Sequence, residues 1–462
     1  MPSSFRRRML GLGLLLTIPI TAINAADVPT VSEGMTIGSG TLTTVTENAT
    51  PTGSYKTYTT KVDVSVKASD DEYDSSSSST SVSSGNSTAS GTDTGSSSSS
   101  STSITYITGS NSVTTTDIVG NATSATSTSS SATATNTQPC NNYAEFCHRK
   151  YSNITEVSAH NSPFVRADNA ASNQELDVTT QLNDGVRFLQ AQIQYASNDT
   201  APHFCHTSCD VLDAGPITDW LTKVKDWVSA HPYDVVTILL GNGNYTKAGE
   251  YVPYIQETGI LNYIYTPPHL PMVLDDWPTL AELILSNQRV IMFMDYETDP
   301  DNYPWLMDEF SNMWETPFDP IDYSFPCTVQ RPPSLSDDDA KNRLYMTNHN
   351  YNVEITAFGA SILVPATSVL NQTNNVTGEG SLGEGAQSCL EDWGRPPNFL
   401  NVDYYNFGGY PGAVFEVAAK MNNVTYNREC CGSASSGAIG SAEALPLGIV
   451  LGAAVMVSWL MT

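Results

Sequence analysis

The sequence predicts an α/β fold, a TIM-type (β/α) barrel, for residues 140–431, with a disordered Ser/Thr-rich stalk before it. Short β-branched, apolar runs recur through this region and are separated by amphipathic or irregular stretches. Strands that alternate with helices favour a parallel sheet, and so many strands favour a closed barrel over a doubly wound sheet. The region is also long enough for one such barrel.

The expected strands are residues 154–159, 186–193, 203–206, 235–240, 290–294, 344–347 and 399–402. The segments 217–230 and 279–286 have the pattern of amphipathic helices, since Trp220, Val224 and Trp227 recur at helical spacing in the first. Asp213 or Thr218 is expected to cap that helix. The sequence holds no GxGxxG motif and no P-loop, which argues against a nucleotide-binding sheet.

Both ends of the chain have the pattern of targeting signals. Residues 1–25 join three arginines to an apolar stretch and a small-residue exit, which is typical of a cleaved signal peptide. Residues 432–462 join tiny residues, a spacer and an apolar tail with no basic residue after it, which predicts a GPI-attachment signal. The alternative is a membrane-spanning anchor, for which the tail is marginally long.

The region between the signal peptide and the barrel, residues 26–139, is dominated by Ser and Thr and has few large apolar residues. Such a segment does not bury enough surface to offset its chain entropy. Its composition is typical of an O-glycosylated stalk, and N-glycosylation sequons such as Asn48 and Asn86 lie within it. We therefore expect a spacer that carries the barrel at the cell surface.

Charge and cysteine content limit the classes of partner and compartment. The chain has 48 acidic and 20 basic side chains and a formal net charge of −28, so nucleic acid is excluded as a partner because binding phosphates requires clustered Lys and Arg. Eight cysteines in a secreted chain predict disulfides, with Cys205 and Cys209 as a local pair. We expect a monomer in the secretory pathway and at the cell surface, held at the outer leaflet by the GPI anchor.

Polar residues at three strand ends are the candidates for chemistry. His160 and Asn161 follow the first apolar strand, Gln190 and Gln192 lie along the second, and His206 ends the third. Residues at the C-terminal ends of barrel strands face the active site. Two histidines there have the chemistry of a general base and a general acid.

With these motifs the chain resembles the phosphatidylinositol-specific phospholipase C X-domain, and most closely the secreted, GPI-anchored PLC-like phosphodiesterases of fungi. The shared pattern is His160-Asn161 after a strand, Gly185-Val186-Arg187 opening the next strand, and a strand with Pro202 and His206. The resemblance covers the region from about residue 140 to 431. It implies a phosphoinositide-type substrate, His160 as general base, His206 as general acid and a cyclic inositol phosphate as product.

The chain departs from that family at the positions that hold a cation. Calcium-dependent members place acidic ligands where Gln190 and Gln192 stand, and a further one near Gly241 or Asn242. Metal-free members place an arginine near Gln192. Calcium prefers several carboxylates, so a family-type calcium site is only weakly supported and no cofactor is expected. Asn161, Gln190 and Gln192 are expected to contact the substrate phosphate.

Other strand-end residues complete the candidate set. Asp403 follows the strand 399–402 and is expected to orient His160, although an ordinary strand-end acid is as plausible. Asp295 is a candidate for contact with a sugar hydroxyl or a metal ion. Asn348 and His349 are weaker candidates for the pocket. His203 is expected to face away from the lumen because it alternates with His206.

Two other hypotheses compete with this enzyme. The missing acidic residues and arginine favour a catalytically degenerate surface barrel that binds glycan or lipid head groups. A relative of the glycerophosphodiesterases is a third reading, but the carboxylate pair for its metal is not found. Retention of substrate without cleavage would favour the binder, and loss of activity in chelator would favour the third reading.

Overall fold

The computed structural model describes residues 55–64, 138–167, 169–197, 199–357 and 360–432. The predicted signal peptide, most of the predicted stalk and the predicted C-terminal anchor lie outside the described residues. Within those ranges, no helix has the length and apolar character needed to cross a bilayer.

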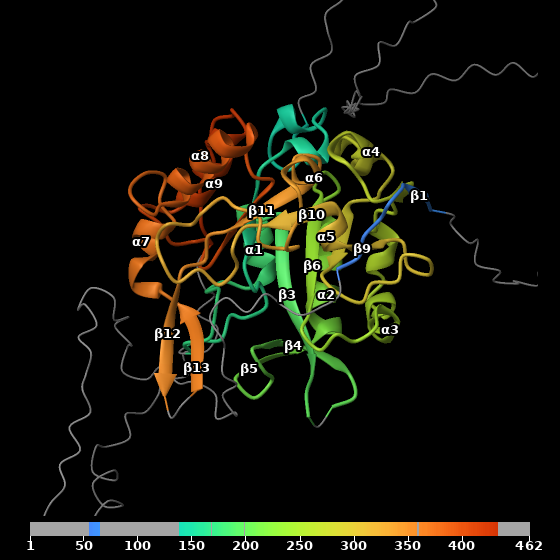
Figure 1. The fold of residues 1–462 in the computed structure, drawn as a ribbon, viewed down its shortest axis with the longest axis horizontal. Coiled ribbons are helices and arrows are strands. Elements are labelled where there is room, and N and C mark those ends of the chain that lie inside the picture. Colours follow the sequence, from blue (N-terminus) through green and yellow to red (C-terminus); the bar gives the residue numbers. More distant parts are fainter. Residues whose placement is uncertain (1–54, 65–137, 168, 198, 358–359, 433–462) are drawn as a thin grey trace, which may run out of the picture.

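A curled sheet of parallel strands forms the centre of the fold (Figure 1). Its hydrogen-bonded neighbours follow the order β10-β11-β14-β2-β3-β6-β8-β9, and every pair along this path is parallel. In the part of the chain that the structure describes, β9 and β10 do not pair, so the barrel is open where the short helix α5 (Glu309–Asn312) connects them. The predicted α/β fold is confirmed.

The strands of this path are β2 (Glu156–Ala159), β3 (Phe188–Tyr195), β6 (Val236–Asn242), β8 (Val290–Met294), β9 (Leu306–Asp308), β10 (Met313–Glu315), β11 (Leu344–Asn348) and β14 (Phe399–Val402). The predicted strands 290–294 and 399–402 match within their bounds, whereas β9 and β10 were not expected from the sequence. Three residues are too few for a recognisable alternation of apolar and polar side chains.

Alternate residues of each strand enter two separate cores. In β8, Val290, Met292 and Met294 pack outward against the helices, whereas Ile291 and Phe293 pack inside the barrel. This division explains why the strands are apolar on both faces, as is usual for parallel sheets covered by helices. The inner core fills the barrel near the N-terminal ends of the strands, and the cavity described below lies at their C-terminal ends.

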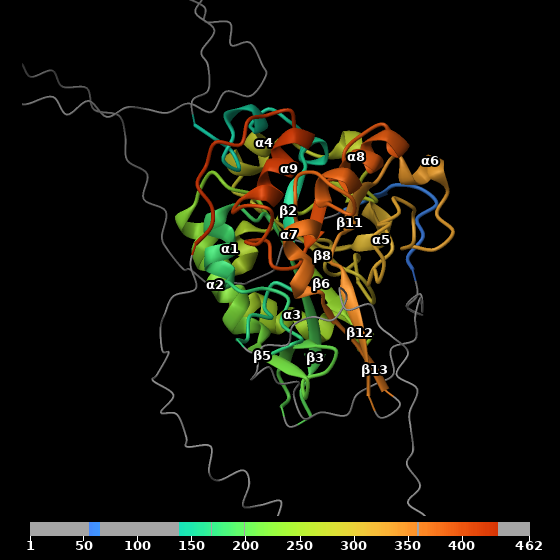
Figure 2. The same ribbon diagram turned by 90° about the vertical axis from the view of Figure 1, so that its left-hand side faces the viewer.

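Helices cover the outside of the sheet, with α1 and α2 on one side and α6 and α8 on the other in Figure 2. The predicted helix 217–230 matches α2, and Thr279 caps α4 by accepting a hydrogen bond from Glu282 N. The predicted cap of α2 is wrong, because Pro216 stands at its N-cap and Asp213 lies in the preceding strand. The remaining bounds are α1 (Val178–Asp184), α2 (Ile217–Ala230), α3 (Ala248–Glu257), α4 (Leu280–Leu285), α6 (Asp337–Ala340), α7 (Leu370–Thr373), α8 (Leu382–Trp393) and α9 (Ala413–Met421).

The predicted strand 203–206 exists but is not part of the parallel barrel. It forms β4 (Pro202–His206), which pairs antiparallel with the far end of β3 and with β5 (Leu212–Pro216). Two further antiparallel pairs are β12 (Asn352–Ala357) with β13 (Ala360–Pro365) and β1 (Val62–Asp63) with β7 (His269–Leu270). The β3–β4 hairpin extends the second barrel strand beyond the rim and brings His206 back toward it.

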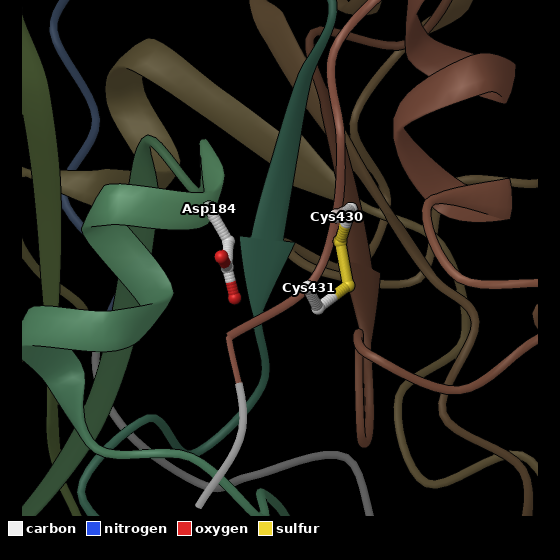
Figure 3. Close-up of side chains that lie close together, drawn as sticks. All are labelled: Asp184, Cys430 and Cys431. Carbon is white, nitrogen blue, oxygen red and sulfur yellow. A yellow bond between two sulfur atoms is a disulfide. The ribbon is translucent and has the colours of Figure 1, made fainter.

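All eight cysteines are paired within the described residues. The predicted Cys205–Cys209 bridge is confirmed, and the other pairs are Cys140–Cys147, Cys327–Cys389 and Cys430–Cys431. Figure 3 shows Asp184 beside the adjacent pair Cys430–Cys431. The Asp184 carboxylate accepts hydrogen bonds from Gly432 N and from the Tyr405 hydroxyl, so it fastens the C-terminal end of the domain to α1.

Candidate active site

A cavity of ≈480 Å³ lies at the C-terminal ends of the barrel strands. Residues two positions apart on a strand share a face, so the lumen positions of β3 continue from Phe188 to Gln190 and Gln192. The same parity brings Asp295 from Phe293 to the cavity. Six of the seven predicted site residues line the cavity directly: His160, Asn161, Gln190, Gln192, His206 and Asp295. The seventh, Asp403, contacts His160.

His160 and Asp403 form a buried pair. They follow the neighbouring strands β2 and β14, and His160 N donates to Val402 O at 3.0 Å. Asp403 Oδ1 lies 2.7 Å from His160 Nδ1, and Asn173 Nδ2 donates to the same oxygen at 2.9 Å. A proton on Nδ1 leaves Nε2 as the nitrogen that faces reaction partners. Burial alone lowers the pKa of His160, but the charge and hydrogen bond of Asp403 outweigh burial and raise it.

His206 stands at the end of β4, on the same cavity as His160. Its ring packs edge-on against Phe164, with ring centroids 5.2 Å apart. Burial, with a smaller effect from the charge of His160, lowers the pKa of His206 to about 3. The two histidines therefore have opposite pKa shifts, and the first proton that the pair binds goes to His160.

Amide side chains, rather than carboxylates, stand at the positions where calcium-dependent members of the similar family have acidic ligands. Asn401 Nδ2 donates to Gln190 Oε1 at 3.2 Å, which holds Gln190 above the inner core. Gly241 faces Gln192 on the neighbouring strand, and a Cβ there would lie 2.5 Å from Gln192 Oε1. A side chain at 241 would therefore displace the Gln192 amide from this position. Asn161 has φ 49°, a conformation that asparagine tolerates, and among the described residues its buried Oδ1 has no hydrogen-bond partner.

These residues do not fit the calcium site that the family resemblance implies. The side chain of Asn242 is engaged in its own loop, with Nδ2 donating to Thr246 O at 2.7 Å and Oδ1 accepting from the Tyr251 hydroxyl at 3.0 Å. Neither glutamine carries the charge that calcium prefers. Within the described ranges the one group of three potential metal ligands is Asp184 with Cys430 and Cys431, whose sulfurs are bonded to each other (Figure 3).

Arg331 is the cationic cavity residue that the sequence analysis missed. It is the only Lys or Arg among the described residues that line the cavity, and its side chain is 9% exposed. NH1 lies 3.1 Å from Glu315 Oε2, and NH2 lies 3.6 Å from Asp295 Oδ2. Arg331 comes from a loop and pairs with β10 through Glu315 N. No periodicity in the sequence marks it.

The carboxylates around Arg331 are strongly perturbed. Burial raises the pKa of Asp295 to about 6, although Arg331 and the backbone N–H of Asn242 act against that rise. Burial and the charge of Glu315 raise the pKa of Glu309 well above its ordinary value. Burial lowers the pKa of Arg331, but Glu315 and its neighbours outweigh burial and keep it raised. The guanidinium is therefore a permanent positive charge inside an otherwise acidic wall.

The remaining candidates divide between the cavity and the scaffold. Asn348 lines the cavity, whereas His349 is turned away and its Nε2 lies 3.1 Å from Thr373 O. His203 faces away from the lumen as predicted, with Nδ1 2.9 Å from Asp213. Asp319, which the sequence analysis did not single out, lies on the wall near His160, and burial raises its pKa.

Comparison with known proteins gives a consistent family. Residues 146–422 match the family described as PI-PLC X 1. An uncharacterized secreted protein of Arthroderma benhamiae is 52% identical over 337 residues, which is 72% of this chain and 76% of that protein. PI-PLC X domain-containing protein 1 of the same fungus is 38% identical over 287 residues, 62% of this chain and 90% of that protein. The phosphatidylinositol-specific phospholipase C of Listeria monocytogenes has a TM-score of 0.39 and 10% identity, over 61% of this chain and 95% of that structure.

Proposed function

The chain belongs to the PI-PLC X family, and from this premise we propose that it cleaves the phosphodiester bond of a phosphoinositide-type substrate by general acid–base catalysis. The observation that carries the proposal is the pair of histidines on one cavity, with Asp403 bonded to only one of them. A buried carboxylate behind one histidine makes that histidine the stronger base. His160 is therefore the general base and His206 the general acid.

In the proposed reaction, neutral His160 takes the proton of the inositol hydroxyl next to the phosphate. The hydroxyl oxygen then bonds to phosphorus, the bond from phosphorus to the glycerol oxygen breaks, and His206 gives its proton to that oxygen. The products are a cyclic phosphate and a free alcohol. His206 is neutral in the empty cavity because its pKa is about 3, so the negative charge of the bound phosphodiester must raise that pKa for His206 to carry its proton.

Arg331 supplies the positive charge that the glutamine positions lack. Its guanidinium lines the cavity and is held by Glu315 and Asp295, so it is available to a phosphoryl oxygen without a bound metal. Asn161, Gln190 and Gln192 contribute neutral hydrogen bonds to phosphate or to the head group, and Asp295 accepts from a ring hydroxyl. These roles are proposals drawn from the positions of the side chains.

The charge of the wall points to the substrate class. One arginine lies against Asp295 and Glu315, and Asp319 lines the same cavity, so a second phosphate on the head group would meet carboxylates rather than cations. Amides and carboxylates together are suited to the hydroxyls of a polyol ring. We therefore propose a head group that carries a single phosphodiester.

The proposed location follows from the disulfides and from the sequence of the two ends. Four disulfides are typical of proteins that fold in an oxidising compartment, and one relative is named a secreted protein. The proposed protein is a monomer in the secretory pathway that reaches the outer surface of the cell. The GPI anchor stays a prediction for residues 432–462, as does the signal peptide for residues 1–25.

A catalytically degenerate barrel is the second candidate, and the uncharged residues at 190 and 192 favour it. The deciding experiment follows phosphatidylinositol cleavage by the full mature chain with phosphorus NMR, with and without chelator. His160→Ala and His206→Ala are each expected to abolish the cyclic phosphate signal, and the exposed His148→Ala serves as control. Retained activity in His206→Ala would remove the assigned acid, and binding of inositol phosphate without turnover in wild type would favour the binder.

A further inference from the structure

A short segment from the predicted stalk lies on the barrel, far ahead in the sequence of residue 140, where the predicted barrel begins. This segment, residues 55–64, is called the strap here. Its strand β1 pairs antiparallel with β7, matching Val62 to Leu270, and Val64 N donates to Pro268 O at 2.9 Å. Figure 1 shows the strap in blue along the side of the domain next to α5. A Ser/Thr-rich composition on both sides hides it in the sequence.

Side chains fasten the strap along its length. Lys61 Nζ lies 2.6 Å from Asp276 Oδ2, and Tyr58 and Val64 pack against the inner core. The strap thus makes a backbone pair, an ion pair and apolar contacts with the same face of the domain. Such a combination of contacts indicates that the strap has a defined position on the domain.

The N-terminal end of the strap reaches the wall of the cavity. The ring of Tyr55 packs edge-on against Phe310, at 5.0 Å between centroids, and against Tyr296, at 5.8 Å. The hydroxyls of Tyr55 and Tyr296 lie 3.4 Å apart. Tyr296 lines the cavity, and Phe310 is fully buried in α5. Edge-to-face aromatic pairs of this kind favour one relative orientation of the rings.

The same two rings support Arg331. Its guanidinium carbon lies 4.7 Å from the centroid of Phe310 and 5.7 Å from that of Tyr296, and its NH2 donates to the Tyr296 hydroxyl at 3.0 Å. Tyr55 and Arg331 therefore contact the same aromatic pair. Any movement of Tyr296 or Phe310 into the space that Tyr55 fills would change the position of the guanidinium.

We propose that Tyr55 is a positioning residue for Arg331 and that the strap is a working part of the catalytic domain rather than of the stalk. The proposal rests on the proposed function where it concerns rate. Its structural content, that the strap holds Tyr296 and Arg331 in place, is independent of turnover.

The test compares Tyr55→Ala with Tyr55→Phe in the full mature chain, and Tyr410→Ala is the control because Tyr410 is exposed and bonds to Glu416 outside the cavity. Tyr55→Ala is expected to lower kcat about 10-fold or more, since small displacements of a positioned group have large effects on rate. Tyr55→Phe keeps the ring contacts and is expected to retain most of the wild-type kcat. In an Arg331→Gln background, Tyr55→Ala is expected to have little further effect.

Hydrogen exchange separates this proposal from the proposed function. Exchange at the backbone of Tyr296 and Arg331 is expected to rise in Tyr55→Ala and to stay unchanged in Tyr55→Phe and Tyr410→Ala. If wild type cleaves no phosphodiester, the proposed function fails and the exchange result alone decides the proposal. Unchanged exchange in Tyr55→Ala overturns the proposal about the strap. In an active wild type, an unchanged kcat in Tyr55→Ala also overturns it, and so does a double variant whose loss of kcat is the product of the losses in Tyr55→Ala and Arg331→Gln.

Discussion

The hydrogen bond between Asp403 and His160 predicts that Asp403→Asn lowers the rate of phosphodiester cleavage. The wild-type bond is 2.7 Å long, and Asp403 is 2% exposed, so it is a buried charge-assisted hydrogen bond. Such bonds contribute about 1.5–3 kcal/mol, which corresponds to about a 10- to 150-fold loss of rate if the contribution is needed in the transition state. An asparagine amide that donates to Nδ1 would also place the ring proton on Nε2, and that tautomer cannot act as base. The loss then rises to as much as about 10⁴-fold, the size seen for the equivalent change in the serine-protease triad.

The pH profile of kcat/KM tests the cause of that loss. His160 must be neutral to accept a proton, so activity rises with pH through its pKa. Asp403 raises this pKa, and its replacement by asparagine therefore moves the acidic limb to lower pH while lowering the plateau. The matched control is Asp213→Asn, which removes the same kind of partner from His203 outside the cavity. Wild-type kcat with an unmoved limb in Asp403→Asn would refute the reasoning.

Three further outcomes are expected. Arg331→Gln lowers kcat about 10²- to 10³-fold, the usual effect of losing one charge-stabilising donor. Adding Glu315→Gln to this variant restores thermal stability but not the rate, because it removes the carboxylate that Arg331→Gln leaves unpaired. The double variant therefore separates the catalytic effect from the effect on folding. Chelator leaves the activity of the wild type within about 2-fold, because the residues at the calcium positions are uncharged, and a loss that added calcium reverses would contradict this. Replacing Cys327 and Cys389 by alanine removes a bridge across a sequence separation of 62 and lowers the free energy of unfolding by about 4 kcal/mol in urea titration, and a change below about 1 kcal/mol would contradict the chain-entropy reasoning.

The sequence predicts the barrel strands well where burial is continuous. Val290–Met294 and Phe399–Val402 are apolar runs between polar segments, and the same pattern with helical spacing predicts α2. The apolar pattern alone does not give the direction of β4, whereas the length of the connection before it does. The loop from β3 to β4 holds only residues 196–201, and a parallel connection needs about a dozen residues, so an antiparallel hairpin was the only arrangement open to it.

The candidate site divides in the same way. His160 and Asp403 were predicted because parallel strands end on one rim. His206 was predicted as a strand end too, but it reaches the cavity through the antiparallel β3–β4 hairpin rather than through a parallel barrel strand. Arg331 and the strap were not predicted, because each reaches the cavity through tertiary contacts that leave no local pattern. Arg331 lies in a loop beside Pro332, and Tyr55 lies in a segment whose composition suggests a spacer. Composition describes the average behaviour of a long segment and does not reveal a short part of it, such as residues 55–64, that packs on the domain.

The charge arrangement of the cavity connects the uncharged glutamines to the proposed substrate. A cation that is part of the chain neither dissociates nor depends on the metal concentration of the surroundings. It must, however, be held by carboxylates, because a lone guanidinium at this depth is costly to desolvate. Glu315 and Asp295 meet that need and at the same time make the wall repel a second phosphate. The proposed metal independence and the proposed preference for a singly phosphorylated head group are thus two consequences of one buried cluster, and a wild type that lacks either property would argue against both.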